Sequence, residues 1–320
     1  MNAEKEQNPR VAALIAAYRR DAELERLLSA LAEGTQRPAC VYVADNASSE
    51  ATREVCRRLG AEWIPAPINR GPGPAWNAAL ETALNDTSLT HFLVLDDDVV
   101  PPPDGLEKML SVMSSAKVGA VAPLLFDEKG KLWGFPEPRE VELRAAIRRV
   151  DDAASAKTVL GRDPHAFCWA TGACMLYRRD AFEQCGKFRE DFWMLGEDLE
   201  FSMRAASQVG GVFTAGVSVP HVPPAPRDPR TAAVAHRGKF LALLQNLSYL
   251  AFRSPHSAHL RWYLPGNFRR YLRTEGWKAC NIRDAAAAFW SGAVCGHPAG
   301  TPSGARLRER AQKRTNAERF

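Results

Sequence analysis

The sequence has no apolar run that is both long and free of helix breakers. The uncharged stretch 209–226 is interrupted repeatedly by Gly and Pro. The N-terminal segment, MNAEKEQNPR, is polar and lacks the apolar core of a secretory signal. We therefore expect neither a transmembrane helix nor a secretory leader.

The cysteines do not form a pattern of disulfides or zinc ligands. There are seven, an odd number, and none has the C-x-x-C spacing. Reduced thiols in a cytosolic protein fit this usage best. Three of them, Cys168, Cys174 and Cys185, are expected to be small buried residues rather than nucleophiles. The sequence also lacks a P-loop, a Ser-His-Asp elbow and a G-x-G-x-x-G segment after its first apolar run.

The net charge of +5 is too small to indicate nucleic-acid binding by itself. A hydrophobic fraction of 46% and a charged fraction of 25% are typical of a globular protein. The last third is nevertheless basic, which indicates an anionic neighbour: a membrane surface, a phosphate-bearing substrate or nucleic acid. A solvated basic tail explains the same pattern. The cations in question are Arg261, Arg269, Arg270, Arg273, Lys278, Arg283, Arg306, Arg308, Arg310, Lys313 and Arg314.

Strand-like and helix-like segments alternate through the first two-thirds of the chain. Apolar runs predict strands at 11–16, 40–44, 62–65, 91–95, 118–125, 173–177 and 211–219. Helical spacing predicts helices at 21–32, 51–59, 74–84 and 196–207, whereas residues 137–163 fit neither pattern. This alternation predicts an α/β fold with a mostly parallel central sheet flanked by helices. From residue 231 onward we expect helices only, so we divide the chain into an α/β domain, 1–225, and a helical extension with a basic tail, 226–320.

Three adjacent carboxylates, Asp96, Asp97 and Asp98, follow the apolar run 91–95. Two like charges about 4 Å apart repel by roughly 4 kcal/mol at an effective dielectric near 20. A divalent cation removes this repulsion, and Mg²⁺ or Mn²⁺ prefers such hard oxygen ligands. In an extended backbone Asp96 and Asp98 point the same way, towards a metal and its ligand, while Asp97 points to structure or to a ribose. The alternative is a solvated acidic turn before the prolines at 101–103.

The segment HFLVLDDDVVPP resembles the DXD segment of family 2 glycosyltransferases, which have the GT-A fold, and its relatives among bacterial rhamnosyl- and galactofuranosyltransferases. VAALIAAYRR, YVADNASS and NRGPGPAWNAAL resemble the family's nucleotide-binding segments, in the expected order. The first of these has Ala16 and Ala17 where the family often has Pro-Thr. The resemblance covers roughly residues 10–225. It implies that the nucleotide-sugar donor is bound by Tyr18, Asp45, Asn46, Asn69, Gly71, Asn77, Asp96 and Asp97.

The segment from Cys168 to Arg204 resembles the acceptor side of the same family. The resemblance places Trp169, Thr171 and Gly172 at the acceptor sugar. It also implies that Asp198, with Glu197, supplies the general base that an inverting transfer requires. The alternative is a pair of ordinary first-turn carboxylates on a surface helix.

His221 follows the strand predicted at 211–219 and stands where the family often has a metal-binding histidine. The resemblance therefore implies a metal site made of Asp96, Asp98 and His221, with Mn²⁺ or Mg²⁺ as the cofactor. The alternative is an ordinary structural histidine.

These features predict an inverting, metal-dependent transfer from a nucleotide-sugar, with UDP- or dTDP-sugars favoured, to a glycan or lipid-linked acceptor. Basic and aromatic residues alternate between 261 and 290, which suits a cytoplasmic enzyme peripherally bound at the inner face of the plasma membrane. A helical cap on the α/β domain is the alternative for that region.

Two other functions remain open from the sequence. A nucleotidyltransferase also uses carboxylates and Mg²⁺, but AAYRRDAE is a poor version of its phosphate loop. The second open function is that of a catalytically inactive GT-A-like protein, which binds glycans or membranes. Binding of nucleic acid through the basic tail is not expected, and steeply salt-dependent DNA retention would reveal it.

Overall fold

The structure, a computed structural model, describes residues 8–161, 163–223, 229–254, 258–301 and 306. The chain divides into two compact units. The first unit contains residues 1–69, 75–187 and 204–224, and the second contains 70–74, 188–203 and 225–320. The division into functional domains at residue 225 stays a prediction.

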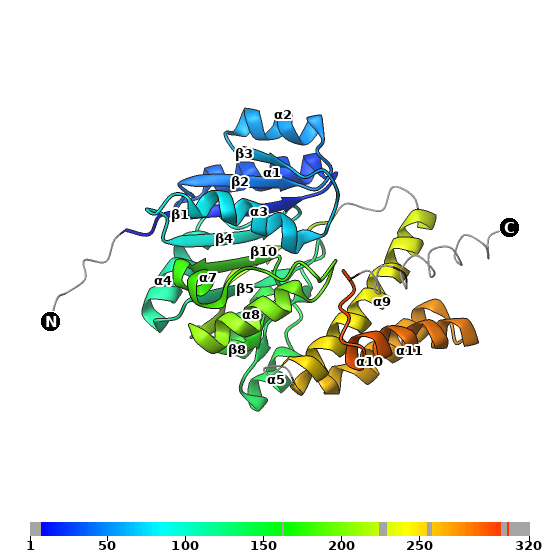
Figure 1. Cartoon of the computed structure of the whole chain (residues 1–320). Helices are drawn as coiled ribbons and strands as arrows, with labels where there is room; N and C mark the ends of the chain where they lie inside the picture. Colours follow the sequence, from blue (N-terminus) through cyan, green and yellow to red (C-terminus); the bar gives the residue numbers. More distant parts are fainter. Residues whose placement is uncertain (1–7, 162, 224–228, 255–257, 302–305, 307–320) are drawn as a thin grey trace. The chain divides into compact units, whose positions relative to one another are not determined.

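A ten-stranded sheet forms the first unit, in the order β3-β2-β1-β4-β9-β5-β10-β8-β7, with β6 paired to β5 (Figure 1). Strands β1 to β4, β5 and β10 all run in one direction, because β9 is antiparallel to both β4 and β5. The strands are β1 (Val11–Ala17), β2 (Cys40–Asp45), β3 (Glu62–Pro65), β4 (His91–Asp96), β5 (Ala120–Phe126), β6 (Leu132–Gly134), β7 (Glu137–Pro138), β8 (His165–Trp169), β9 (Cys174–Arg178) and β10 (Gly211–Pro220).

Helices cover both faces of this sheet, as its buried strands require. They are α1 (Asp21–Glu33), α2 (Glu50–Leu59), α3 (Pro72–Leu84), α4 (Gly105–Ala116), α5 (Val141–Ile147), α6 (Ala153–Leu160), α7 (Arg179–Cys185) and α8 (Glu197–Gln208). Alternate β1 residues, such as Ala13 and Ile15, join one core cluster with Leu24, Leu27 and Leu28 of α1. The predicted α/β fold, with a central sheet flanked by helices, is therefore confirmed.

The opposite face of the sheet is closed by aromatic side chains. Trp76 of α3 is buried, and its Nε1 donates to the carbonyl of Leu95 at 3.0 Å. Phe92 of β4 contacts Phe182 of α7 edge to face, with ring centroids 5.5 Å apart. Because both faces of β4 are packed, the residues at its end are held in fixed positions.

The second unit is built around helices α9 (Pro229–Arg253), α10 (Leu264–Glu275) and α11 (Ala279–Ala293), with a short 3₁₀ helix, η1 (Ala258–Tyr263) (Figure 1). A small core of Phe240, Leu241, Leu244, Tyr271 and Leu272 joins α9 to α10.

The close packing of α9 and α11 depends on Gly292. A Cβ there would meet the carbonyl oxygen of Gln245 at 2.1 Å. The expectation of helices only from residue 231 is confirmed for the described residues.

None of the described helices has an apolar stretch long enough to cross a bilayer. Most of the basic tail that the sequence singled out, including Arg308, Arg310, Lys313 and Arg314, lies outside the described residues.

Candidate functional site

The carboxyl ends of three neighbouring parallel strands meet at one edge of the sheet. Ala17 at the end of β1 pairs with Asp45 at the end of β2, and Ala16 pairs with Asp96 at the end of β4. Ligands of open α/β sheets bind at such edges. The donor residues that the sequence predicted at Tyr18, Asp45 and Asp96 therefore lie on adjacent strand ends.

His221 reaches the acidic run through a short antiparallel pairing. Val100 N donates to the carbonyl of Pro220 at 2.9 Å, and Val222 N donates to the carbonyl of Asp98 at 2.8 Å. Between these two bonds, His221 is paired with Val99 in an antiparallel β-bridge. Two segments more than a hundred residues apart in the sequence are thereby fixed side by side.

Asp96, Asp98 and His221 form a compact group of potential metal ligands. Each offers one ligand atom, and these atoms lie within 4.8 Å of one another. Asp98 Oδ1 lies 3.2 Å from His221 Nε2, and both side chains are buried. The structure thus brings together the three residues that the sequence predicted as ligands.

Arg20, which sequence reasoning missed, binds the same acidic run. Its Nη1 donates to Asp97 Oδ1 at 2.8 Å and also to Asp98 Oδ2. The second oxygen of Asp97, Oδ2, accepts the backbone N–H of Tyr18 at 2.9 Å. Both oxygens of Asp97 are therefore engaged by the end of β1 and the start of α1. The pair of arginines directly after the first predicted strand was the available signal.

The two buried carboxylates at the end of the run differ in their electrostatics. Burial raises the pKa of Asp97 to about 6, although the Arg20 guanidinium works in the opposite direction. Burial also opposes ionisation of Asp98. There, however, the His221 imidazole and the Arg20 guanidinium outweigh it, so the pKa of Asp98 lies below its usual value. Asp98 is therefore the more firmly ionised of the two.

The donor set fits a divalent cation. Among the described residues, His221 Nδ1 is buried and makes no hydrogen bond, and the buried Asp98 Oδ1 faces His221 Nε2 at 3.2 Å. Three carboxylates and one guanidinium give the cluster a formal charge of −2, which a divalent ion would neutralise. Two carboxylates and an imidazole suit Mn²⁺, and they would leave coordination positions for phosphate oxygens.

The loop after β2 is held by Asp45. Asp45 Oδ1 accepts from Ala47 N at 2.8 Å, and Oδ2 accepts from Ser49 N at 2.7 Å and from Trp63 Nε1 at 3.2 Å. Asn46 N donates to the carbonyl of Ala17 at 2.9 Å, which ties this loop to β1. The contact between Asp45 and a base stays a prediction.

The remaining donor residues predicted from sequence differ in exposure. Tyr18 is 40% exposed, and the Arg19 guanidinium lies 5.2 Å from the centre of its ring. Asn69 is half-buried, and Asn77 is buried on α3.

Gly71 belongs to the second unit. It has φ of +97°, and a Cβ there would lie 1.7 Å from the carbonyl oxygen of Trp193. Glycine is therefore required at this position for steric as well as conformational reasons.

The predicted acceptor turn lies directly against the acidic run. Asp96 N donates to the carbonyl of Ala173 at 3.0 Å, so the turn containing Thr171 and Gly172 abuts the end of β4. Trp169 is half-buried at the end of β8. The first unit therefore contains the predicted metal ligands and the predicted acceptor turn at adjoining positions.

Glu197 and Asp198 begin α8 and belong to the second unit. Glu197 is buried, whereas Asp198 is half-buried, with its Oδ1 accepting from Leu199 N at 2.8 Å and Gly196 N at 3.3 Å. Leu195 and Gly196 just before them have φ of 64° and 113°. A positive φ at leucine is strained and persists only where the surroundings enforce it.

Asn246 of α9 supplies that enforcement, and sequence reasoning did not identify it. It is fully buried, and its Nδ2 donates to the carbonyls of Met194 at 3.1 Å and Leu195 at 2.8 Å. Its Oδ1 accepts from Ala299 N at 2.8 Å. Within the second unit, the helical extension therefore fixes the loop that precedes Asp198.

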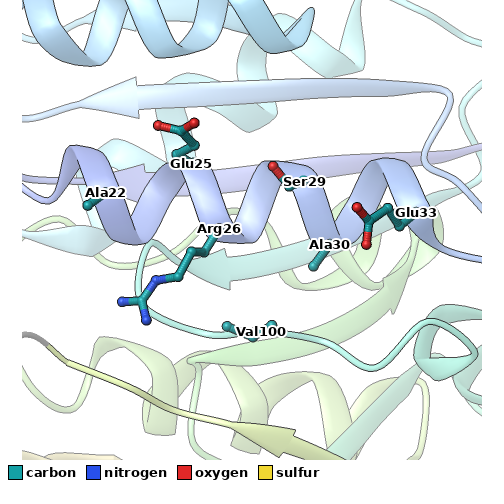
Figure 2. A pocket seen from close by; sticks show the side chains of 7 residues that line it. All are labelled: Ala22, Glu25, Arg26, Ser29, Ala30, Glu33 and Val100. Carbon is teal, nitrogen blue, oxygen red and sulfur yellow. The ribbon is translucent and has the colours of Figure 1, made fainter.

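A hollow of about 540 Å³ lies along α1 (Figure 2). Its lining residues are Ala22, Glu25, Arg26, Ser29, Ala30, Glu33 and Val100. None of them belongs to the predicted site, so the candidate site is defined by the strand ends rather than by this hollow.

A mostly parallel sheet with an acidic strand end and a histidine beside it is typical of a glycosyltransferase of the GT-A fold. Residues 12–186, more than half of the chain, match the model of glycosyl transferase family 2. The chain belongs to glycosyl transferase family 2. Membership places it among glycosyltransferases rather than nucleotidyltransferases.

Similar proteins agree with this assignment. An N-acetylglucosaminyl-diphospho-decaprenol L-rhamnosyltransferase of Mycobacterium tuberculosis is 28% identical over 268 residues, covering 76% of this chain and 85% of that protein. The mannosyltransferase PcManGT of Pyrobaculum calidifontis, solved with GDP-Man and Mn²⁺, has a TM-score of 0.51 at 20% identity, covering 96% of this chain and 80% of its own. Residues 1–349 of S. aureus TarS with UDP-GlcNAc give a TM-score of 0.57 at 13% identity, covering 97% and 91%.

Proposed function

We propose that the protein is an inverting, metal-dependent glycosyltransferase of cell-surface polysaccharide synthesis. It takes a sugar from a UDP- or dTDP-sugar and transfers it to a hydroxyl of a glycan or lipid-linked acceptor. The observation that carries the proposal is the convergence of Asp96, Asp98 and His221 at the end of β4. The name of the rhamnosyltransferase relative, which acts on a diphospho-decaprenol, supports a lipid-linked acceptor.

In this proposal each group of the chain has a chemical task. Asp96, Asp98 and His221 hold Mn²⁺ in preference to Mg²⁺, since one ligand is an imidazole. A bound divalent ion supplies charge stabilisation to the departing diphosphate. Tyr18, Asp45, Asn46, Asn69, Gly71 and Asn77 hold the nucleotide-sugar, with Asp97 fixing the end of β1.

On the acceptor side, Trp169, Thr171 and Gly172 position the sugar. Asp198, aided by Glu197, removes the proton from the attacking hydroxyl. The start of α8 stabilises the negative charge of Asp198 before the proton is taken.

Donor binding can be tested by thermal unfolding with UDP-, dTDP-, GDP- and CDP-sugars, with and without Mn²⁺. One UDP- or dTDP-sugar should raise the unfolding temperature only when Mn²⁺ is present, because a ligand of the native state stabilises it by mass action. Asp98→Asn and His221→Ala should remove that increase. Equal increases in the variants, or an increase that does not need Mn²⁺, would sink the proposed metal site.

The second unit also presents a surface suited to the cytoplasmic face of a membrane. Ile282, Ala286 and Trp290 on α11 and Val294 at its C-cap follow one another at intervals of four residues, and all four are exposed. We call these four residues the α11 stripe.

Two further tryptophans of the same unit, Trp262 and Trp277, are 88% and 63% exposed. The same unit also exposes cations at Arg269, Arg270, Arg273, Lys278 and Arg283. Exposed apolar, aromatic and cationic side chains in one helical unit suit an interface with anionic lipid. We therefore include peripheral membrane binding in the proposed function.

Vesicle sedimentation tests this surface. The protein should sediment with vesicles that contain phosphatidylglycerol and much less with pure phosphatidylcholine. The double variant Ile282→Ser/Trp290→Ser should bind the anionic vesicles about tenfold more weakly, since it removes the apolar contact. Val141→Ser is the matched control, because Val141 is 68% exposed on α5, outside the α11 stripe. Equal partitioning of all three proteins would rule out the stripe as a membrane contact.

A further inference from the structure

The two ring nitrogens of His221 have different surroundings. Nε2 lies 3.2 Å from Asp98 Oδ1, on the side of the proposed metal ligands. Nδ1 is buried and makes no hydrogen bond to any residue that the structure describes. A metal-binding histidine usually donates this other N–H to a carboxylate, a carbonyl or water, which fixes the plane of its ring.

Trp133 lies flat against that ring. The centroids of the two rings are 3.8 Å apart and their planes differ by 21°, which is a stacked arrangement. Stacked aromatic pairs gain free energy beyond the burial of their area, and only in restricted orientations. The indole therefore limits rotation of the imidazole in a way that an aliphatic neighbour would not.

Strand β5 fixes the backbone of both Trp133 and His221. Leu132 and Gly134, on either side of Trp133, pair with Phe126 and Leu125 of β5. His221 N donates to the carbonyl of the same Phe126 at 2.7 Å. The end of β5 thus holds the two rings in register with each other.

Trp133 does not serve the core of the protein. Its side chain is 47% exposed, although tryptophan is usually well buried. The core that contains β5 is formed by other residues, among them Leu125 and Val121. The position of a large, half-exposed indole at this point is accounted for by what it covers, which is His221.

We propose that Trp133 is a positioning residue of the metal site, which holds the His221 imidazole in the plane that directs Nε2 towards the metal. The stack orients the ring, as a hydrogen bond to the other ring nitrogen usually does at such a site. This inference rests on the proposed function, because it needs Asp96, Asp98 and His221 to bind a metal. Removing the residue that orients a metal ligand typically weakens metal binding by about 10- to 100-fold.

Direct titration of Mn²⁺ tests the inference without an activity assay. Free Mn²⁺ is measured by electron paramagnetic resonance, in the presence of UDP and, separately, of dTDP. Trp133→Ala should bind Mn²⁺ about 10- to 100-fold more weakly than the wild type. Trp133→Phe should recover most of the affinity, because phenylalanine can also stack on the imidazole. Val141→Ala, which truncates a side chain that is 68% exposed on α5, should bind as the wild type does.

His221→Ala separates failure of this inference from failure of the proposed function. If His221→Ala and the wild type bind Mn²⁺ equally, the metal site and the inference are both wrong. If His221→Ala weakens binding and Trp133→Ala does not, the metal site stands and the role of Trp133 is overturned. The inference is also overturned if Trp133→Phe binds Mn²⁺ as weakly as Trp133→Ala does. It is overturned too if Trp133→Ala lowers the unfolding temperature of the metal-free protein so far that lost stability accounts for the weaker binding. A change in acceptor KM with unchanged Mn²⁺ affinity would make Trp133 an acceptor contact instead.

Discussion

At the scale of single residues, Arg20 determines how the acidic run can exist without a metal. Its guanidinium bridges Asp97 and Asp98, and its pKa is raised because these two carboxylates outweigh the effect of burial. Asp97 in turn engages the backbone of Tyr18. One of the three carboxylates is thereby assigned to structure, and Asp96 and Asp98 remain for the metal.

Replacing Arg20 by Gln should destabilise the protein in a pH-dependent way. Asp97 is buried, so loss of its partner leaves a buried charge without compensation. Because Arg20 is itself one-third exposed, we expect a loss of about 2 kcal/mol at pH 7.5, below the 3–5 kcal/mol of a fully buried pair. Urea unfolding of wild type and variant at pH 7.5 and at pH 5 measures it.

The sign of this pH dependence follows from the pKa of Asp97. Its folded-state pKa, about 6, is above the ordinary 3.8, so its contribution to stability is present below 3.8 and is lost as pH rises through about 6. Without Arg20 the folded-state pKa rises further, and the loss at pH 7.5 grows. The double variant Arg20→Gln/Asp97→Asn should recover most of it. A loss as large at pH 5 as at pH 7.5 would contradict the account.

At the scale of elements, the loop before α8 shows why a helical extension matters to a transferase. Asn246 of α9 donates to the carbonyls of Met194 and Leu195. The backbone has positive φ at Leu195 and at the next residue, Gly196. The proposed base, Asp198, follows within three residues. We infer that α9 fixes the loop backbone and thereby the direction in which the Asp198 side chain points.

Asn246→Ala should therefore lower kcat by about tenfold or more with little change in donor binding, because small displacements of a reacting group are costly. Ser248→Ala is the matched control, since Ser248 is also buried on α9 but its hydroxyl donates within its own helix, to the carbonyl of Leu244. Steady-state kinetics and Mn²⁺-dependent thermal shifts measure the two effects. Equal kcat in the two variants at similar stability would remove Asn246 from this role.

The sequence was sufficient for elements whose signal is local and strong. The buried run of β1 and the leucines of α1 were predicted within one or two residues, and β3 was predicted at 62–65 with no error. The antiparallel strands β6, β7 and β8 were not predicted. The pairing of β7 and β8 depends on distant partners, and β6 has only three residues.

The short helices α5 and α6 were missed because seven or eight residues give little periodicity. The capping box of Asp152 and Ser155 was the available signal for α6. Helix α4 was also left unassigned, although Leu106, Met109 and Met113 have helical spacing and are buried.

The site divides in the same way. The carboxylates and His221 were predicted because their types and order resemble a family pattern, and the structure groups Asp96, Asp98 and His221. Arg20, Trp133 and Asn246 were not predicted, because their roles depend on contacts that only the fold creates. The donor and acceptor contacts of the other predicted residues stay predictions.

At the scale of the whole molecule, the two compact units contribute different parts of the proposed reaction. The first unit contains the proposed metal ligands, most of the proposed nucleotide-binding residues and the proposed acceptor turn. The second unit carries Asp198 and the α11 stripe. The proposal therefore requires that donor binding and proton removal can be lost separately by substitution.

The most direct measurement is release of nucleoside diphosphate from the donor identified by thermal unfolding, with a decaprenyl-diphosphate-linked glycan acceptor. Asp198→Asn should keep the Mn²⁺-dependent thermal shift but lose at least about a hundredfold in turnover, in line with loss of a general base. Chelation should abolish turnover by the wild type, and added Mn²⁺ should restore it. Full activity in excess chelator, or unchanged turnover by Asp198→Asn, would contradict the account.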